Sequence, residues 1–225
     1  MQLDYKVNEA GYASALFMRI SQEKRQRIVS SAVREFAALG FASANVNRIA
    51  QEAGISVGSL YQYFSAKDDL FMYIVELGAS AIAGHVSRII QADIRLSSKL
   101  ERLLRLAQDY SREDPDLIRL YNVFSSEKEE ERARIIADKL ESITAQAYRD
   151  MILEAQKKGE IRADIDPGIL AFLLDNQLLL MQYSFACPYH KRRLALFVGQ
   201  ANIQDNEYLI RSIMTALESM CDIRP

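Results

Sequence analysis

The chain has 225 residues, 49% of them hydrophobic, and a formal net charge of −2 at pH 7. This is enough apolar material to bury one or two hydrophobic cores without help from disulfides or a structural metal. Its two cysteines, Cys187 and Cys221, form no CxxC pair and have no histidine at a zinc-site spacing. We therefore expect no metal, no cofactor and a reducing, cytoplasmic location.

The first residues show no cationic segment followed by an apolar run and a small-residue cleavage site, so we expect no secretory signal. The apolar stretch 169–186 carries Asp175, Asn176 and Gln177 at its middle. A single Asp at the centre of a membrane span costs roughly 2.5 to 3.5 kcal/mol. The stretch is therefore predicted to be a buried helix, with no membrane as a partner.

Helical spacing of apolar residues runs through almost the whole chain, beginning after residues 1–20, which predict an irregular arm or a short extra helix. Capping side chains and terminal glycines then bound three predicted helices: 22–39 between Ser21 and Gly40, 46–53 between Asn45 and Gly54, and 56–64. These three helices predict a compact N-terminal head.

A long fourth helix is predicted from Ser65, where Asp68 completes a capping-box-like start, through Ala81. Further helices are predicted at 98–112, 116–124, 127–158, 167–186 and 206–221. Residues 187–193 (CPYHKRR) are predicted to form an exposed basic loop. No strand pattern is present. The predicted fold class is all-α, with a helix-turn-helix head at residues 1–67 and a larger helical ligand-binding and dimerisation body at residues 68–225.

The net charge hides an asymmetry along the chain. Between Arg19 and Lys67, seven basic residues (Arg19, Lys24, Arg25, Arg27, Arg34, Arg48, Lys67) face three acidic ones (Glu23, Glu35, Glu52). This local excess of four positive charges suits a phosphate backbone, while the rest of the chain is acidic.

Residues 46–64 have the pattern of a helix-turn-helix. Ala50 allows two helices to cross closely, and Gly54 allows the turn between them. Four apolar positions point to a three-helix core (Ile49, Ala53, Ile55, Leu60), and a small, mostly polar set points elsewhere (Asn47, Arg48, Ser56, Val57, Ser59, Gln62). Gly58 permits close approach to a phosphate, and Tyr61, Tyr63 and Lys67 supply donors.

The run from Ala50 to Leu70, AQEAGISVGSLYQYFSAKDDL, resembles the TetR family of bacterial repressors, and the resemblance covers about residues 26–70. It implies a homodimer that places two recognition helices in successive major grooves of near-palindromic operator DNA, about 34 Å or somewhat more apart. It also implies phosphate contacts by Asn45, Val46, Tyr61, Tyr63 and Lys67, and base contacts by Asn47, Arg48, Val57, Ser59 and Gln62.

Within that set, Gln62 suits an adenine edge and Val57 a thymine methyl group, each discriminating by about 1 to 3 kcal/mol. One position departs from the family. Members usually carry Thr where this chain has Ala44 and Asn45, so a hydroxyl that caps the second helix and meets a phosphate is replaced. Asn45 can still cap this helix, whereas Ala44 cannot donate a hydrogen bond.

Two late helices, 167–186 and 206–221, are apolar nearly all round, which predicts burial against a second subunit as well as the core. The resemblance implies a four-helix dimer interface made by these helices, and a small, apolar effector bound in the body. Aromatic residues with a few polar groups are typical of ligand cavities, and the candidates are Tyr110, Tyr121, Phe124, Tyr148, Phe172 and Asn176.

These features favour a sequence-specific, DNA-binding transcriptional regulator, a repressor that a small molecule releases from its operator. The alternative is a module of the same fold that binds DNA or protein without ligand-controlled transcriptional activity. An enzyme is not expected, because the sequence shows no nucleophile with its base, no phosphate-binding glycine loop and no metal cluster.

Overall fold

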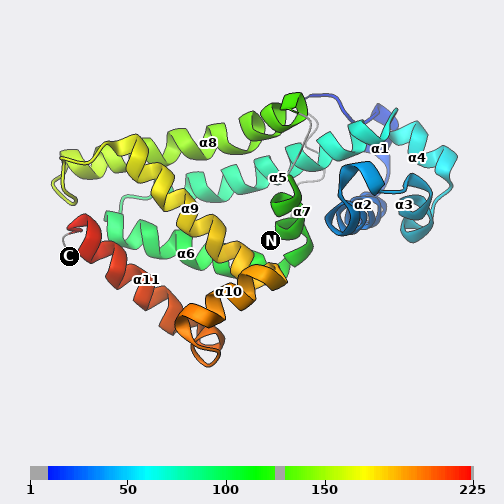
Figure 1. The fold of residues 1–225 in the computed structure, drawn as a ribbon. Helices are drawn as coiled ribbons and strands as arrows, with labels where there is room; N and C mark the ends of the chain where they lie inside the picture. The colour runs from blue at the N-terminus through cyan, green and yellow to red at the C-terminus, as the bar shows by residue number, and fades with distance from the viewer. Residues whose placement is uncertain (1–9, 125–129, 224–225) are drawn as a thin grey trace. The chain divides into compact units, whose positions relative to one another are not determined.

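The computed structural model describes residues 10–124 and 130–223, and every regular element in these ranges is helical (Figure 1). The all-α prediction is therefore confirmed. In chain order the elements are α1 (Ala15–Arg19), α2 (Gln22–Ser43), α3 (Val46–Ala53), α4 (Val57–Tyr63), α5 (Lys67–Ile90), α6 (Leu96–Glu113), α7 (Pro115–Phe124), α8 (Glu130–Lys157), α9 (Pro167–Ala186), α10 (Pro188–Val198), the 3₁₀ turn η1 (Asn202–Gln204) and α11 (Asn206–Cys221).

Local capping chemistry sets the boundaries of the head helices as the sequence predicts. Asn45 Oδ1 accepts a hydrogen bond from the backbone N–H of Asn47 at 2.9 Å, so Asn45 caps α3. Gly54 ends α3 with a φ of 69°, a left-handed conformation that a glycine adopts at little cost. Ser56 Oγ accepts from the N–H of Ser59 and caps α4. Ile49, Ala50 and Leu60 are buried, as a helix-turn-helix core requires.

Helix α2 ends later than predicted. Gly40 has the expected positive φ of 71°, but another helical turn follows it and α2 ends at Ser43 instead of residue 39. Two sets of hydrogen bonds hold this extra turn: Ala44 N–H donates to Gly40 O at 3.2 Å, and Lys67 Nζ donates to the carbonyl oxygens of Phe41, Ala42 and Ala44. Gly40 therefore bends the helix and does not terminate it.

A short helix precedes the head and anchors it. Ser14 caps α1, its N–H donates to Tyr63 O at 2.9 Å, and its hydroxyl donates to Gln62 O at 2.8 Å. The last carbonyls of α4 thus have partners on α1. Phe17 is fully buried, with ring centroids 4.7 Å from Phe64 and 5.3 Å from Tyr73. Of the two possibilities predicted for residues 1–20, the described part contains the short helix.

The predicted start of the fourth helix is shifted. Helix α5 begins at Lys67, so the third residue of its first turn is Asp69, and Asp69 Oδ2 accepts from the N–H of Ala66 at 3.1 Å. The predicted cap with Ser65 and Asp68 is therefore wrong by one position. Asp68 instead forms an ion pair with Arg132 Nη1 at 2.6 Å.

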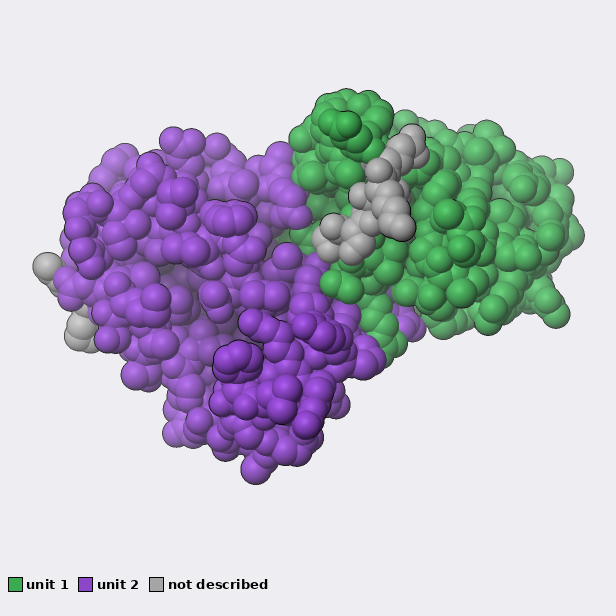
Figure 2. All heavy atoms as spheres, in the orientation of Figure 1, with its two compact units in different colours: residues 1–82, 119–140 green, residues 83–118, 141–225 purple. Residues whose placement is uncertain are grey.

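The chain divides into two compact units (Figure 2): residues 1–82 with 119–140, and residues 83–118 with 141–225. In the first unit, the buried side chains of α5 and α7 join the aromatic core of the head. Phe71 contacts Phe36, Phe41 and Phe124 at ring-centroid distances of 5.1, 4.9 and 5.0 Å. The predicted division between residues 67 and 68 stays a prediction about folding domains, which compactness alone does not test.

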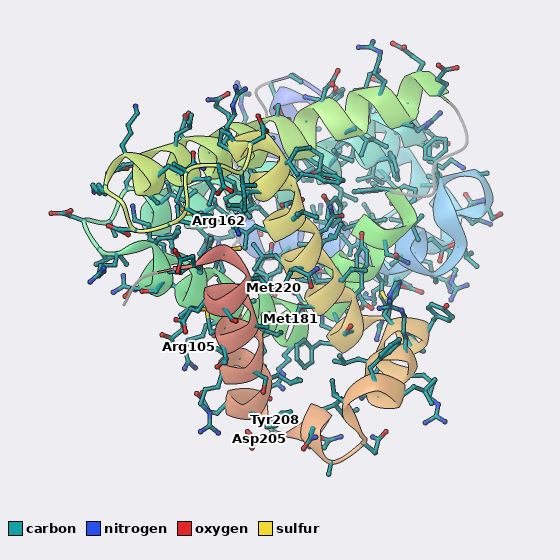
Figure 3. The ribbon with its side chains drawn as sticks, turned by 60° about the vertical axis from the view of Figure 1, so that its left-hand side comes forward. Arg105, Arg162, Met181, Asp205, Tyr208 and Met220 are labelled. Atoms are coloured by element: carbon teal, nitrogen blue, oxygen red, sulfur yellow. The ribbon has the colours of Figure 1, made fainter. Side chains whose placement is uncertain are left out.

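The second unit is built on α6, which packs against both α9 and α11. Asp166 caps α9 with Pro167 at its first position, as predicted, and Asp205 caps α11. Arg105 on α6 holds Glu207 in the first turn of α11 through a bidentate ion pair of 2.7 and 2.9 Å. Figure 3 labels Arg105 beside this end of α11, where Asp205 and Tyr208 lie, with Met220 near its other end.

The basic loop predicted at residues 187–193 is wrong, because this segment forms most of a helix, α10. Pro188 stands at its first position, where a missing N–H costs nothing, and Gly199 ends it with a φ of 87°. Cys187 is buried, while Lys191, Arg192 and Arg193 are exposed on the helix. The run of basic residues does not distinguish the two structures, because charged residues are common on exposed helices as well as in loops.

Two of the described helices, α5 and α9, are long and apolar enough to cross a membrane by length and composition alone. The core of the protein explains much of this apolar character. Residues 70–78 of α5 are buried throughout, and α9 buries Leu170, Leu174 and Leu178 within the second unit. Core helices of soluble proteins pass the same test.

Candidate nucleic-acid interface and ligand cavity

Helix α4 presents its predicted outward set on the surface of the first unit. Ser56, Gly58, Tyr61 and Gln62 are exposed, while Val57 and Ser59 are half-buried. The hydroxyls of Ser56 and Ser59 lie 2.8 Å apart and hydrogen-bond each other, which fixes the first turn. The last turn is fixed from behind by Ser14. A short helix held at both ends, with a small and polar outer face, can enter a major groove without a clash.

A charged cluster joins α3 to α2. Glu35 on α2 is buried; one carboxylate oxygen accepts from the N–H of Asn45 at 3.1 Å and the other lies 3.3 Å from Arg48 Nε. Arg48 Nε also lies 3.3 Å from Glu52. Arg48 and Asn47 are both exposed, as a base-reading role requires. Because the Arg48 Nε already has two carboxylate partners, its role at a base edge stays a prediction.

The residues predicted to hold phosphates differ in accessibility. Asn45 and Tyr61 are exposed, Val46 is half-buried, and Tyr63 is buried with its ring centroid 5.8 Å from that of Phe17. Lys67 Nζ lies 2.8 Å from Phe41 O and 4.7 Å from the centre of the Phe41 ring. Lys67 therefore has a structural role that the sequence did not reveal, namely holding the last turn of α2.

We expect Lys67→Met to lower the free energy of unfolding by about 1 to 3 kcal/mol, because it leaves three carbonyls at the end of α2 without their charged donor. Urea unfolding followed by circular dichroism measures this loss. Lys157→Met, at an exposed position of α8, is the matched control and should change stability by less than about 0.5 kcal/mol. Equal stability of the two variants would contradict the structural role.

A cavity of about 530 Å³ lies in the second unit between α8 and α9. Small residues at facing positions, Ala145, Gly168 and Ala171, leave the space, and Phe172 and Leu179 add apolar walls. Polar groups also line it: Glu141, Ser142, Thr144, Gln146, Tyr148, Arg149, Asp175 and Asn176. A second, almost wholly apolar cavity of about 270 Å³ lies among α6, α8, α9 and α11.

The larger cavity contains three of the six predicted ligand residues, Tyr148, Phe172 and Asn176. Tyr110, Tyr121 and Phe124 are not part of its lining; Phe124 belongs to the aromatic core of the first unit. Asp175 and Glu141 also line the cavity and were not predicted. A charged residue in the middle of an apolar stretch is the signal in the sequence for a polar cavity beside α9.

Asp175 lies in an environment that disfavours its charge. Burial, together with the nearby Glu141, raises the pKa of Asp175 to about 6. Burial, with Asp175 and Glu141 as further causes, also raises the pKa of Tyr148. Among the described residues, no lysine or arginine forms an ion pair with Asp175. Two carboxyl groups, Asp175 and Glu141, and one arginine, Arg149, thus line the cavity.

The raised pKa of Asp175 predicts a pH-dependent stability. The folded state binds the carboxyl proton of Asp175 more tightly than the unfolded state does. The free energy of unfolding of the wild type therefore falls as pH rises from about 4 to about 6. Asp175→Asn removes this cost, so the variant should be more stable than wild type by about 2 to 3 kcal/mol above pH 7 and similar to it at pH 4. Chemical unfolding at several pH values measures the difference.

Asp164→Asn is the control for that experiment. Arg162 holds the exposed Asp164 in an ion pair of 2.6 Å and lowers the pKa of this carboxyl to about 2. A lowered pKa stabilises the folded state above the ordinary aspartate range, so Asp164→Asn should give no gain at pH 7. A pH-independent effect of Asp175→Asn would show that Asp175 is not buried as described.

Exposed hydrophobic side chains gather on the last three helices. Of twelve large hydrophobic residues exposed in the described ranges, nine lie on α9, α10 and α11: Ile169, Phe172, Leu173, Leu180, Tyr189, Leu196, Phe197, Tyr208 and Met220. Scattered apolar residues are ordinary on a surface, but a concentration of this kind marks an interaction site. Two of these helices, α9 and α11, are those predicted to form a dimer interface.

The crossing of α3 and α4, the left-handed turn at Gly54 and the outward polar set define a helix-turn-helix protein. Residues 28–74 match the family model described as "Bacterial regulatory proteins, tetR family". The head therefore has the sequence of this family, and a solved TetR family regulator shares the fold over nearly the whole chain. The resemblance predicted from the sequence is confirmed.

Known relatives match only part of the chain. The Mannheimia succiniciproducens protein named nucleoid occlusion factor SlmA is 25% identical over 128 residues, which are 55% of this chain and 59% of that protein. The HTH-type transcriptional regulator HbdR of an Aromatoleum species is 29% identical over 92 residues, 41% of this chain and 39% of that protein. The chain thus spans less than two thirds of either relative.

Solved structures match the chain almost completely. A TetR family transcriptional regulator from Chloroflexus aurantiacus superposes with a TM-score of 0.69 at 21% identity, over 93% of this chain and 98% of that one. FadR from Bacillus subtilis, solved in complex with stearoyl-CoA, gives a TM-score of 0.67 at 18% identity, over 85% and 96%. At these identities the likeness concerns the fold.

Proposed function

We propose that this protein is a cytoplasmic, homodimeric DNA-binding transcriptional regulator, a repressor that a small molecule releases from a near-palindromic operator. The observation that carries the proposal is the geometry of α4, which is anchored at both ends and presents Ser56, Tyr61 and Gln62 outward. The matching relatives and structures are named as regulatory or DNA-associated proteins rather than enzymes, which supports a regulatory role.

The two other parts of the proposal rest on the second unit. Its exposed apolar residues on α9 and α11 support dimerisation. Its cavity of about 530 Å³ is large enough for a small molecule, and FadR, a protein of the same fold, was solved with stearoyl-CoA bound. A ligand that prefers one conformation shifts the population of that conformation and with it the affinity for DNA.

Binding to the DNA upstream of the protein's own gene tests the proposal. We expect dissociation constants of about 10⁻⁸ M or below, at least 1000-fold tighter than binding to unrelated DNA, with affinity falling steeply as salt rises. Electrophoretic mobility shift assays with both DNAs across a salt series measure this. Equal affinity for both DNAs would refute sequence-specific regulation.

We expect Gln62→Ala to weaken operator binding by about 1 to 3 kcal/mol and to relax the preference for adenine at one operator position. The physical reason is that an amide can pair with both N6 and N7 of adenine, whereas alanine cannot. A binding-site selection on wild type and variant measures the change. Gln200→Ala, at an exposed position outside the first unit, is the control. An unchanged base preference at every position would exclude Gln62 from base reading.

A second candidate function is a DNA- or protein-binding module without ligand-controlled transcription. The similarity to a protein named as a nucleoid occlusion factor favours it, as does Ala44 at a position where a hydroxyl is usual. Mapping of binding sites across the genome separates the two candidates. Sites near a few promoters support the regulator, and sites spread over the chromosome without effects on transcript levels support the module.

A further inference from the structure

The cavity between α8 and α9 has the chemistry of a site for a positively charged ligand. Glu141, Ala145 and Tyr148 recur on one face of α8, and Gly168, Ala171, Asp175 and Leu179 recur on one face of α9. Two carboxyl groups from opposite helices therefore meet in one cavity. Apolar residues border the two carboxyl groups, so the cavity has an acidic part and an apolar part.

Tyr148 adds a polar group to the cavity that makes no hydrogen bond within the described part of the protein. Its side chain is only 4% exposed, it lines the cavity, and it makes no hydrogen bond within the described ranges. The Tyr148 ring is buried, while its hydroxyl is accessible from the cavity and available to a ligand. Both carboxyl groups influence the Tyr148 hydroxyl electrostatically, so the three polar groups lie near one another.

The charges around the site leave Asp175 without a cation. From α8, Glu141, Tyr148 and Arg149 face the cavity, and from α9 Asp175 is the ionisable group in the lining. Arg149 has an exposed side chain and makes no ion pair with Asp175. A buried carboxylate is costly unless a positive charge compensates it. A cation brought by a ligand supplies that compensation, whereas an anionic ligand is repelled.

We propose that this cavity binds a small amphipathic amine, an organic cation whose charged end lies between Asp175 and Glu141. The Tyr148 hydroxyl accepts a hydrogen bond from the ammonium group, and the apolar part of the ligand lies against Ala171, Phe172 and Leu179. This inference rests on the proposed function, because it names the chemical class of the effector. It also replaces the apolar effector predicted from the sequence with an amphipathic one.

Three probes with one skeleton and different end groups test the proposal: 4-phenylbutylamine, 4-phenylbutanol and 4-phenylbutyrate. Isothermal titration calorimetry on the full chain without DNA should show the amine binding at least 10-fold tighter than the alcohol, with the carboxylate weakest. Affinity for the amine should increase from pH 5 to pH 7.5, since Asp175 must lose its proton. A carboxylate that binds as tightly as the amine, or an alcohol that does, overturns the proposal.

Variants assign the effect to the cavity. Asp175→Asn keeps the shape of the side chain and should weaken amine binding at least 10-fold, with alcohol binding unchanged within about twofold. Tyr148→Phe should weaken the amine about threefold or more. Glu154→Gln, on α8 but outside this cavity, is the control and should bind the amine like wild type. Unchanged amine affinity in Asp175→Asn, with a native circular dichroism spectrum, refutes the site.

A separate DNA-release assay distinguishes failure of this proposal from failure of the proposed function. If the amine binds but leaves operator affinity unchanged, the cation site is supported and control of DNA binding through this site is refuted. If the amine does not bind while operator binding is specific, the cation site is refuted and the proposed regulator function is supported. The two measurements use the same protein and share no readout.

Discussion

Leu173→Glu is expected to convert the proposed homodimer to a monomer and to weaken operator binding at least 100-fold. Leu173 is 51% exposed on α9, and Met220 is 72% exposed on α11; both border the apolar cavity of about 270 Å³ between these helices. A carboxylate buried among such side chains in an interface has no cation to compensate it. Loss of the second head removes the gain in affinity that two linked binding sites provide, typically 100- to 10,000-fold.

Analytical ultracentrifugation and a mobility shift assay on the same preparation measure the two effects of Leu173→Glu. Ala137→Glu adds the same charge at an exposed position of α8, outside the concentration of exposed hydrophobic residues, and should remain dimeric with wild-type DNA affinity. A Leu173→Glu protein that stays dimeric would exclude this part of α9 from the interface. A monomer with full affinity would show that one head suffices.

Phe17→Ala is expected to lower the free energy of unfolding by about 3 to 5 kcal/mol, as other truncations of fully buried aromatic side chains do. The Phe17 ring lies among those of Tyr63, Phe64 and Tyr73, at centroid distances of 5.8, 4.7 and 5.3 Å. Its removal leaves a cavity behind α4 and takes away the contacts that hold α1 in place.

Operator binding should fall with stability in Phe17→Ala, because Ser14 on the same short helix fixes the last carbonyls of α4. Leu16→Ala changes the neighbouring residue, which is 47% exposed, and should cost less than about 1 kcal/mol. Urea unfolding of the two variants, with a mobility shift assay at low temperature, measures both effects. Similar losses in the two variants would mean that α1 does not support the head.

The sequence predicted those elements whose limits depend on neighbouring residues. Asn45, Gly54 and Asp166 act through hydrogen bonds or backbone angles within one turn, so their types and positions suffice to place α3 and α9. The helix-turn-helix is recognisable for the same reason. The position of Gly40 within α2 was not predictable, since the turn after it is held by Lys67, which comes much later in the chain.

The cavity shows the complementary case. Aromatic type selected Tyr148 and Phe172 correctly as residues of one cavity, but it also selected Phe124, which packs in the aromatic core with Phe71. Asp175 and Glu141 lie on different helices, and only the packing of α8 against α9 brings their charges together. The spacing of residues within one helix does not predict contacts between two helices, so Asp175 and Glu141 were not predicted as cavity residues.

The discontinuity of the first unit matters for anyone who wishes to graft its helix-turn-helix onto another body. Residues 1–82 share a compact unit with residues 119–140, and Phe71 reaches both Phe36 and Phe124. A chimera that takes only residues 1–67 from this protein would lack Phe71 and its contact with Phe36. Recombination between members of such a fold therefore preserves packing best when it exchanges two stretches together, and a single crossover early in the chain is a poor route to a new repressor.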